Sequence, residues 1–382
     1  MRTSDILFRC SMLVMLCAAA AMTVGAQGAP DHVEVAFVAN AEGAEVAMVD
    51  VAARAIIGSI AVNLADVEAS GPGAPNYAQD TDVSPDGRTL YVSRGYPGDV
   101  AAFEIASGRP LWTRPLNTLR ADHMTLSKDG RELFVSVFID HRVYRLSTEG
   151  NITGQFASGI FPHDVQISKD GRRLFNTSLG QMPSFPVPAG HQPLEKPDVP
   201  VQLTIVDAAT LAIRDRIALD VAMRPWHFNA DETGIFAELS NQHAVVFYDL
   251  AARKVTRRLD LPMKPGITVK DWDFEAPFHG LALTDDGSTL CLAGRASDYA
   301  ALVRASDLTL IATVPVGDGP GWSETADNGR VCLIANTRSD DLSIVSIADR
   351  KELVRLPIGN GPKHITVARI PASVVAEARA RK

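Results

Sequence analysis

The sequence predicts an all-β protein of seven small sheets in a ring, and three observations carry this prediction. A turn signature recurs about every 40 residues, short alternating apolar runs follow each copy, and the two ends of the chain hold incomplete units. Gly87, Gly130 and Gly171 end clean copies of the turn, 43 and 41 residues apart, and Gly287 and Gly329 are 42 apart. A four-stranded unit of about 40 residues is typical of the blade of a β-propeller.

The strands of each unit follow from period-two patterning. The runs "TLYVS", "ELFVS", "TLCLAG" and "VCLIAN" follow successive turns, and second alternating runs such as "DVAAFEI" and "DLSIVSI" follow them. Runs of five to seven residues broken by Asp-Gly turns indicate strands. One further strand precedes each turn, and these first strands are expected to begin near Asp80, Asp122, His163, Trp226, His279, Trp322 and His364.

The two chain ends are expected to share one blade. At the C-terminus, "PKHITVAR" is a first strand that no further strands follow. At the N-terminus, "VEVAFVANAEGAEVAMVDVAARAIIGSIAVN" contains three strands but no first strand. Pairing the two fragments closes the ring and removes free sheet edges. A single domain over residues 27–371 follows, and residues 372–382 form a C-terminal tail with the one helical pattern of note.

The N-terminus has the features of a secretory signal over residues 1–26. Arg2 and Arg9 precede an apolar run from Cys10 to Val24, and "VGAQ" offers a cleavage site near Ala26. The alternative is an N-terminal membrane anchor, but the run is short for one. We therefore expect a periplasmic or secreted protein without membrane insertion. The net charge of −8 argues against nucleic acid as a partner, because nucleic-acid binding relies on basic residues.

Cofactor motifs are few. No Cys-x-x-Cys-His occurs, which excludes covalently attached haem c, and no phosphate loop or nucleotide fingerprint appears. Cys291 and Cys332 could pair in an oxidising compartment. Their equivalent positions in two units instead favour buried, small apolar residues over a redox pair.

The stretch "CLIANTRSDDLSIVSIADRKELVRLPIGNGPKHITVA" resembles the YVTN-repeat family of seven-bladed propellers, as does "AFVANAEGAEVAMVDVAARAIIGSIAV". The resemblance covers essentially all of the chain after the signal and implies the propeller fold. It implies no single function, because similar propellers serve as surface proteins, binding modules and enzymes.

Imidazole and carboxylate groups gather where the first strands begin. In a propeller these positions ring one mouth of the central channel, and both groups suit copper, zinc or iron. Similar His-lined mouths resemble, in outline, the copper sites of nitrous oxide reductase and thiocyanate dehydrogenase and the metal sites of propeller lyases and lactonases. The candidate metal ligands are His123, His163, His227, His279, His364, Asp82 and Asp164, and the candidate catalytic residues are His163, His279, Arg94 and Arg295.

A structural alternative applies to each of these residues. A repeat places equivalent residues in a ring by construction, and a His before a first strand can simply bond a turn Asp. His123 and His163 also differ by one position when aligned on their Asp-Gly turns, so their rings need not point the same way. Arg94 and Arg295 could bind a carboxylate or only pair across blades.

Three insertions, at residues 68–80, 179–200 and 262–278, are expected to rise from the face that carries the histidines. Long loops on one face of a rigid scaffold favour a site for a small molecule, glycan or protein. The sequence thus predicts a monomeric propeller that binds a transition metal, with lyase, lactonase or oxidoreductase chemistry open. A non-catalytic binding module and a cell-envelope scaffold are the alternatives.

Overall fold

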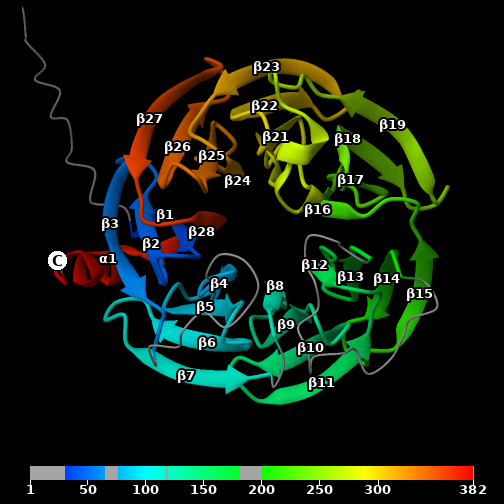
Figure 1. The fold of residues 1–382 in the computed structure, drawn as a ribbon. Coiled ribbons are helices and arrows are strands. Elements are labelled where there is room, and N and C mark those ends of the chain that lie inside the picture. The colour runs from blue at the N-terminus through cyan, green and yellow to red at the C-terminus, as the bar shows by residue number, and fades with distance from the viewer. Residues whose placement is uncertain (1–30, 65–75, 117–118, 181–199, 382) are drawn as a thin grey trace, which may run out of the picture. The chain divides into compact units, whose positions relative to one another are not determined.

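The computed structural model describes all residues except 1–30, 65–75, 117–118, 181–199 and 382. The expected signal peptide and most of the insertions at 68–80 and 179–200 therefore lie outside the described residues. Within the described part, seven four-stranded antiparallel sheets form a ring, with the first strand of each sheet innermost (Figure 1). The predicted all-β, seven-bladed β-propeller is confirmed.

One sheet joins the two ends of the chain. It has the order β28 (Pro362–Pro371), β1 (His32–Asn40), β2 (Glu45–Asp50) and β3 (Ala55–Ala61). The β28–β1 register runs from His32 opposite Pro371 to Asn40 opposite Pro362, with one bulge. The predicted ring closure is therefore confirmed.

The other six sheets each consist of four consecutive strands. They are β4 (Asp80–Val83), β5 (Thr89–Arg94), β6 (Asp99–Glu104) and β7 (Pro110–Pro115); β8 (Ala121–Leu126), β9 (Glu132–Val137), β10 (Arg142–Ser147) and β11 (Ile152–Ala157); β12 (Pro162–Ile167), β13 (Arg173–Ser178), β14 (Gln202–Asp207) and β15 (Ile213–Ala218); β16 (Met223–Phe228), β17 (Gly234–Leu239), β18 (Gln242–Asp249) and β19 (Lys254–Asp260); β20 (Leu281–Leu283), β21 (Thr289–Gly294), β22 (Tyr299–Arg304) and β23 (Thr309–Pro315); β24 (Pro320–Ala326), β25 (Val331–Asn336), β26 (Asp341–Ser346) and β27 (Lys351–Pro357).

The recurring Asp-Gly signature forms the turn between first and second strands. Ser84 Oγ donates to Asp86 Oδ1 at 2.5 Å and accepts from the Thr89 N–H at 2.9 Å. Gly87 has φ +66°, a left-handed conformation that glycine adopts without steric cost. The same bonds recur around Asp129, Asp170 and Asp286, so these aspartates hold turns.

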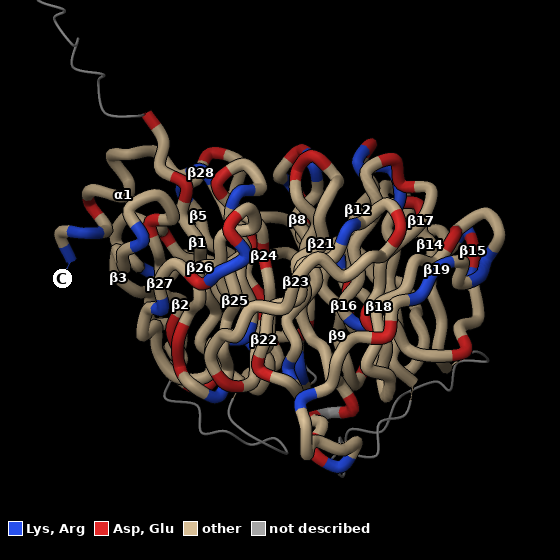
Figure 2. Tube along the Cα trace, turned by 90° about the horizontal axis from the view of Figure 1, so that it is seen from above, with Lys and Arg blue, Asp and Glu red and all other residues tan. Residues whose placement is uncertain are grey.

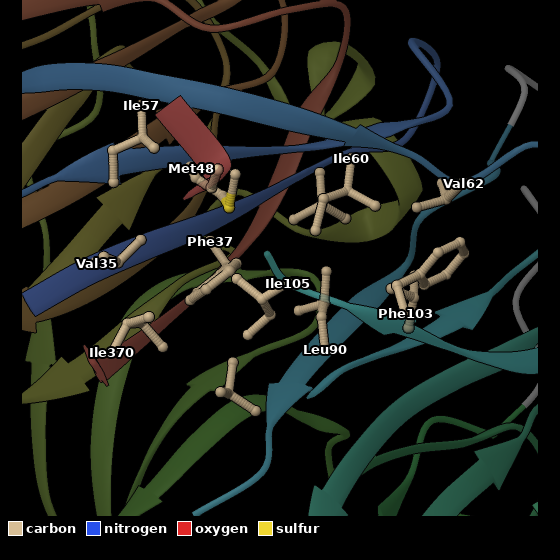
Figure 3. Close-up of a cluster of buried hydrophobic side chains, with 14 of the residues drawn as sticks. Val35, Phe37, Met48, Ile57, Ile60, Val62, Leu90, Phe103, Ile105 and Ile370 are labelled. Carbon is tan, nitrogen blue, oxygen red and sulfur yellow. The ribbon is translucent and has the colours of Figure 1, made fainter. Parts of the chain in front are cut away.

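Apolar side chains fill the spaces between neighbouring sheets. Figure 3 shows one such cluster, in which Phe37 and Met48 of the closing sheet meet Leu90 and Phe103 of the next. Helix α1 (Ala372–Arg379) forms in the C-terminal tail and adds Val374, Val375 and Ala378 to this cluster. Burial of these groups at the closing sheet stabilises the joined ends of the chain.

Cys291 on β21 and Cys332 on β25 form a disulfide, with Cα atoms 6.2 Å apart. The pairing that the sequence left open is therefore present, and the two cysteines are buried as expected. Both are fully buried between two adjacent sheets. Their equivalent positions bring the two sulfurs together, because second strands of adjacent blades lie face to face.

Figure 2 shows the ring edge-on, with its two faces above and below. We call the face where first strands begin the loop face and the opposite one the turn face. Residues 262–278 lie on the loop face and contain two short 3₁₀ helices, η1 (Val269–Asp271) and η2 (Asp273–Glu275). In the part of the chain that the structure describes, no helix has the length and apolar character needed to cross a bilayer.

Candidate metal centre

The candidate site begins with irregularities in the innermost strands. The β8–β9 register shifts between Ala121 and Met124, and the β12–β13 register shifts between Pro162 and Val165. Each bulge contains the adjacent His and Asp that the sequence singled out. Because a bulge re-aims side chains and often adjoins a functional site, the two strands can direct their histidines to one point.

Four of the five predicted histidines meet in the central channel. The ring centroids of His123 and His163 are 4.4 Å apart, those of His163 and His279 are 5.6 Å apart, and those of His123 and His364 are 5.4 Å apart. One nitrogen from each of His123, His163 and His279 lies within 4.8 Å of the other two, and Asp80, His123 and His364 form a second such group. We call these four histidines with Asp80 the histidine cluster.

Hydrogen bonds fix the orientation of several of these rings. His279 Nδ1 lies 3.0 Å from the Gly321 carbonyl oxygen and, as an N–H, donates to it. His123 Nδ1 lies 3.3 Å from Asp80 Oδ2, within hydrogen-bond distance. His364 Nδ1 makes a close contact of 2.7 Å with Asp80 Oδ1 without the geometry of a hydrogen bond. Metal-ligating histidines characteristically commit one nitrogen to a carbonyl or carboxylate in this way. The Nε2 atoms of His123 and His279 are then the ones left for a ligand.

The second ring nitrogen of His123 makes no hydrogen bond. Its Nε2 is buried without a hydrogen-bond partner, with Asp122 Oδ1 3.7 Å away, and His163 Nδ1 is buried without a partner as well. Buried polar atoms are normally satisfied. Two unpartnered imidazole nitrogens at one point therefore suit an ion that would accept their lone pairs.

Trp322 forms one wall of the cluster. Its ring lies 4.0 Å from that of His364, 5.1 Å from that of His123 and 5.8 Å from that of His279. The indole restricts the rotation of these imidazoles and keeps water from one side.

Burial favours neutral rings for most of these histidines. It is the main cause that lowers the pKa of His163 and His279 well below the ordinary value, and neighbouring charges, including Arg224, add to it. Burial likewise lowers the pKa of His364. Neutral imidazole is the form that binds metals.

His123 differs from the other three histidines because carboxylates lie close to its ring. Burial opposes both charges, but the bond to Asp80, with the charges of Asp122 and Asp80, outweighs it and raises the pKa of His123. Burial likewise raises the pKa of Asp80, but His364 and His123 outweigh it, so that pKa is lowered. Asp80 is therefore the charged group that orients both rings.

A cavity of about 710 Å³ occupies the turn-face part of the central channel and extends to the cluster. Asp80, His123, His364 and Trp322 are among its lining residues, whereas His163 and His279 are not. Burial raises the pKa of three further lining carboxyl groups, to about 6 for Asp82 and Asp164 and about 7 for Glu324.

Three predicted metal ligands lie outside the histidine cluster. His227 bonds through Nδ1 to the Phe228 carbonyl oxygen at 2.6 Å. Asp82 accepts the Leu126 N–H at 2.8 Å, and Asp164 accepts the Trp226 N–H at 3.2 Å. Both carboxylates thus satisfy backbone donors on the inner strand of the next blade.

The two candidate arginines have different surroundings. Arg94 is 4% exposed, holds Asp99 through two bonds of 2.6 and 2.5 Å and donates to the Val62 carbonyl. Arg295 lies close to the cluster, because a Cβ added to Gly321 would be 3.2 Å from its Nη1. Only Arg295 therefore adjoins the histidines.

Sequence reasoning missed several groups at this site. Asp80 was placed in the ring but not among the metal ligands, although its carboxylate contacts two histidines. Arg224 and Lys363 lie at the starts of the first strands β16 and β28, and sequence reasoning did not single them out. Their signal was available, since both occupy the strand start that drew attention to the histidines.

No protein-family profile matches this chain, and no curated protein sequence does. Solved structures do match. A periplasmic gluconolactonase from Pseudomonas aeruginosa superposes with TM-score 0.65 and 19% identity, over 89% of this chain and 99% of its own. A candidate 6-phosphogluconolactonase from Bacteroides fragilis gives 0.65 and 14%, over 88% and 98%. Hydrazine synthase from Kuenenia stuttgartiensis gives 0.64 and 18%, over 81% and 91%. At such identities the likeness concerns the fold alone.

Proposed function

We propose that this chain is a secreted or periplasmic propeller of the YVTN-repeat type that binds one transition-metal ion and uses it to act on a small molecule. The observation that carries the proposal is the approach of three imidazole nitrogens, from His123, His163 and His279, to within 4.8 Å of one another. The three residues come from three different blades.

The donor set fits such an ion. Nitrogens bound to tetrahedral zinc lie ~3.3 Å apart, given bonds of about 2.0–2.1 Å. Since the three nitrogens lie within 4.8 Å of one another, they would approach by at most ~1.5 Å on binding, within the reach of small side-chain rotations. Three His ligands leave a further position open, as catalytic rather than structural sites do. Copper, zinc and iron remain the candidate metals.

The chemistry that the metal would supply is that of a Lewis acid, which polarises a carbonyl oxygen. Near it, the second ring nitrogen of His364 is placed to take up a proton, because burial favours the neutral ring and the first nitrogen faces Asp80 Oδ1 at 2.7 Å. Trp322 shields this pair on one side. These roles suit hydrolysis of a cyclic or acyclic ester, and two structural neighbours are named as lactonases or candidates for one.

The extracytoplasmic location rests on two features. The first 26 residues have the pattern of a secretory signal, and the Cys291–Cys332 disulfide is of the kind that persists in oxidising compartments.

Metal content tests the proposal. Purified full-length protein, loaded with Zn²⁺ or Co²⁺ and passed through a desalting column, should retain about one equivalent. His163→Ala and His279→Ala should lose it, while His227→Ala, a matched control on another inner strand, should retain it. Equal metal content in all four proteins would contradict the metal site. If the metal-loaded protein does not hydrolyse D-glucono-1,5-lactone faster than the background rate, only the lactonase reaction is contradicted.

A further inference from the structure

Carboxyl groups dominate the wall of the cavity on the turn face. Its lining residues come mainly from the innermost strands of all seven blades and from the turns that follow them. Two lysines and no arginine line it, whereas its carboxyl side chains are those of Glu34, Asp80, Asp82, Asp164, Glu232, Asp285 and Glu324. The volume of about 710 Å³ lies in the range of small-molecule pockets. The cavity is therefore large enough for an organic ligand and has an excess of acidic groups.

The two lysines, Lys128 and Lys169, lie at the rim of the cavity. Both are exposed and belong to the Asp-Gly turns that follow β8 and β12. The charge of Lys128 acts on Asp82, but burial outweighs it, so the pKa of Asp82 is raised. Of the other carboxyl groups, Glu34 accepts a backbone N–H at 2.8 Å and Glu232 accepts the Lys169 N–H. No lysine or arginine lines the cavity farther in.

Three carboxyl groups on the innermost strands have no cationic partner. Asp82, Asp164 and Glu324 lie on β4, β12 and β24, in three different blades. Among the described residues their donors are backbone N–H groups and, for Asp164, the Gln166 amide. His123 acts on Asp164, but burial outweighs its effect and raises the pKa of this carboxyl group as well. Because a buried charge without a counter-charge is costly, these three groups favour a positively charged ligand.

Several polar atoms at the wall of the cavity lack a hydrogen-bond partner. The bonds to Asp164 end on Oδ2 and the bond to Glu324 ends on Oε1, so the described residues leave one oxygen of each carboxyl group without a donor. At the inner end of the cavity, one buried ring nitrogen of His123 and one of His364 make no hydrogen bond. Buried polar atoms are normally satisfied, so these atoms indicate a bound molecule.

The three inner carboxyl groups lie too far apart to ligate a single metal ion. In the part of the chain that the structure describes, neither group of ligand atoms within 4.8 Å of one another includes Asp82, Asp164 or Glu324. A molecule with several N–H donors can instead reach oxygens spread around a cavity. A cleft lined by charges of one sign also raises the local concentration of ligands of the opposite charge. An organic cation therefore suits this wall better than a bare ion.

We propose that the turn-face cavity binds a small organic cation, a molecule whose ammonium or guanidinium group is held by Asp82, Asp164 and Glu324. Its other end lies against His123 and His364, so that the cation is the substrate of the histidine cluster. The word substrate rests on the metal-dependent reaction proposed above, whereas binding of the cation does not. The molecule enters from the turn face, opposite the face that carries the inserted residues 262–278.

Calorimetry with metal-free, full-length protein at pH 8 and constant ionic strength tests the binding. The probes have the same chain length and different charges: 1,4-diaminobutane, 1,4-butanediol and succinate. We expect the diamine to bind at least about tenfold more tightly than the diol, and succinate to bind more weakly than either, because hydrogen bonds to charged groups are the strong ones. Equal affinity for the diamine and the diol, or tighter binding of Ca²⁺ than of the diamine, would overturn the inference.

Two isosteric variants locate the binding. Glu324→Gln and Asp82→Asn keep an acceptor for their backbone N–H partners and should each weaken diamine binding about tenfold. Asp307→Asn is the matched control, because this half-exposed carboxylate pairs with Arg304 and does not line the cavity. Its affinity for the diamine should equal that of the wild type. Thermal melts check that the variants fold, and wild-type affinity in both cavity variants would show that the diamine binds elsewhere.

Hydrolysis by the metal-loaded protein tests the substrate class. Ethyl 6-aminohexanoate and ethyl heptanoate differ in a terminal ammonium or methyl group, and kcat/KM should be at least about tenfold higher for the ammonium ester. Equal values would overturn the cationic substrate. If neither ester is hydrolysed, the metal-dependent reaction is contradicted, and calorimetry still decides whether the cavity binds a cation. Metal content measured on the same samples separates the two sites, because a protein that binds one metal ion but no diamine overturns this inference alone.

Discussion

The imidazole rings of His123 and His163 lie 4.4 Å apart, although the two residues differ by one position relative to their Asp-Gly turns. In regular strands that offset would send them to opposite faces of their sheets. The bulges at the starts of β8 and β12 remove the conflict, because each releases a His-Asp pair from the ladder. The candidate metal centre thus depends on irregular backbone, and its orientation depends on Asp80.

Replacing Asp80 by Asn should separate metal affinity from stability. The variant loses the charge that orients His123 and His364, so metal affinity should fall about 10- to 100-fold. Asp82→Asn is the matched control, because Asp82 also accepts a backbone N–H of β8 but contacts no histidine of the cluster. Asp80→Asn should also lose about 1–3 kcal/mol of unfolding free energy. Asp82→Asn keeps an acceptor for the Leu126 N–H and removes a carboxyl group whose pKa burial raises, so its stability should not fall. Competitive titration with a chelating dye measures the affinity, and equal losses in the two variants would exclude the orienting role of Asp80.

Glu238 should make the protein less stable as pH rises. Its side chain is fully buried and accepts the Gly280 N–H at 2.9 Å, next to His279. Burial raises its pKa well above the ordinary value, against the effect of that bond. The folded state therefore binds a proton that the unfolded state releases above about pH 4.3, and stability falls by up to ~1.4 kcal/mol per pH unit until the folded pKa is reached.

Glu238→Gln keeps an acceptor for the Gly280 N–H and removes the titration. The variant should gain stability relative to the wild type between pH 5 and pH 8 in denaturant melts. A difference that stays constant over this range would show that Glu238 does not titrate in this way.

Reduction of the Cys291–Cys332 disulfide should destabilise the ring between two adjacent blades. The two cysteines are 41 residues apart, for which loop closure in the unfolded chain predicts a loss of about 4 kcal/mol. Denaturant melts with and without a reductant measure this loss of unfolding free energy. The double variant Cys291→Ala/Cys332→Ala is the control, because the reductant should not change its stability. Two free thiols in protein recovered from an oxidising compartment would contradict the bond.

The fold was predictable because it is repeated. Each Asp-Gly turn has a local cause, seen in Ser84, Asp86 and Gly87, and the alternating runs between turns need no long-range information. The closing blade followed from counting strands. The N-terminal fragment has three strands and lacks a first strand, and the C-terminal fragment consists of a first strand alone.

The site was only partly predictable because bulges and pairings are tertiary. Sequence could not show that Asp82 and Asp164 satisfy backbone N–H groups of the next blade while Asp80 orients histidines. It likewise could not show that Arg94 is held by Asp99 or that Cys291 meets Cys332. Those outcomes depend on which neighbour the ring brings close, and a single sequence does not encode this as a local pattern.

The central claim is that three blades direct imidazoles to a single ion. Crystals soaked in Zn²⁺ or Co²⁺, with anomalous difference density measured at the metal edge, test it most directly. We predict one strong peak in the central channel, ~2.0–2.2 Å from one nitrogen each of His123, His163 and His279. Peaks confined to surface residues, with the channel empty, would contradict the account.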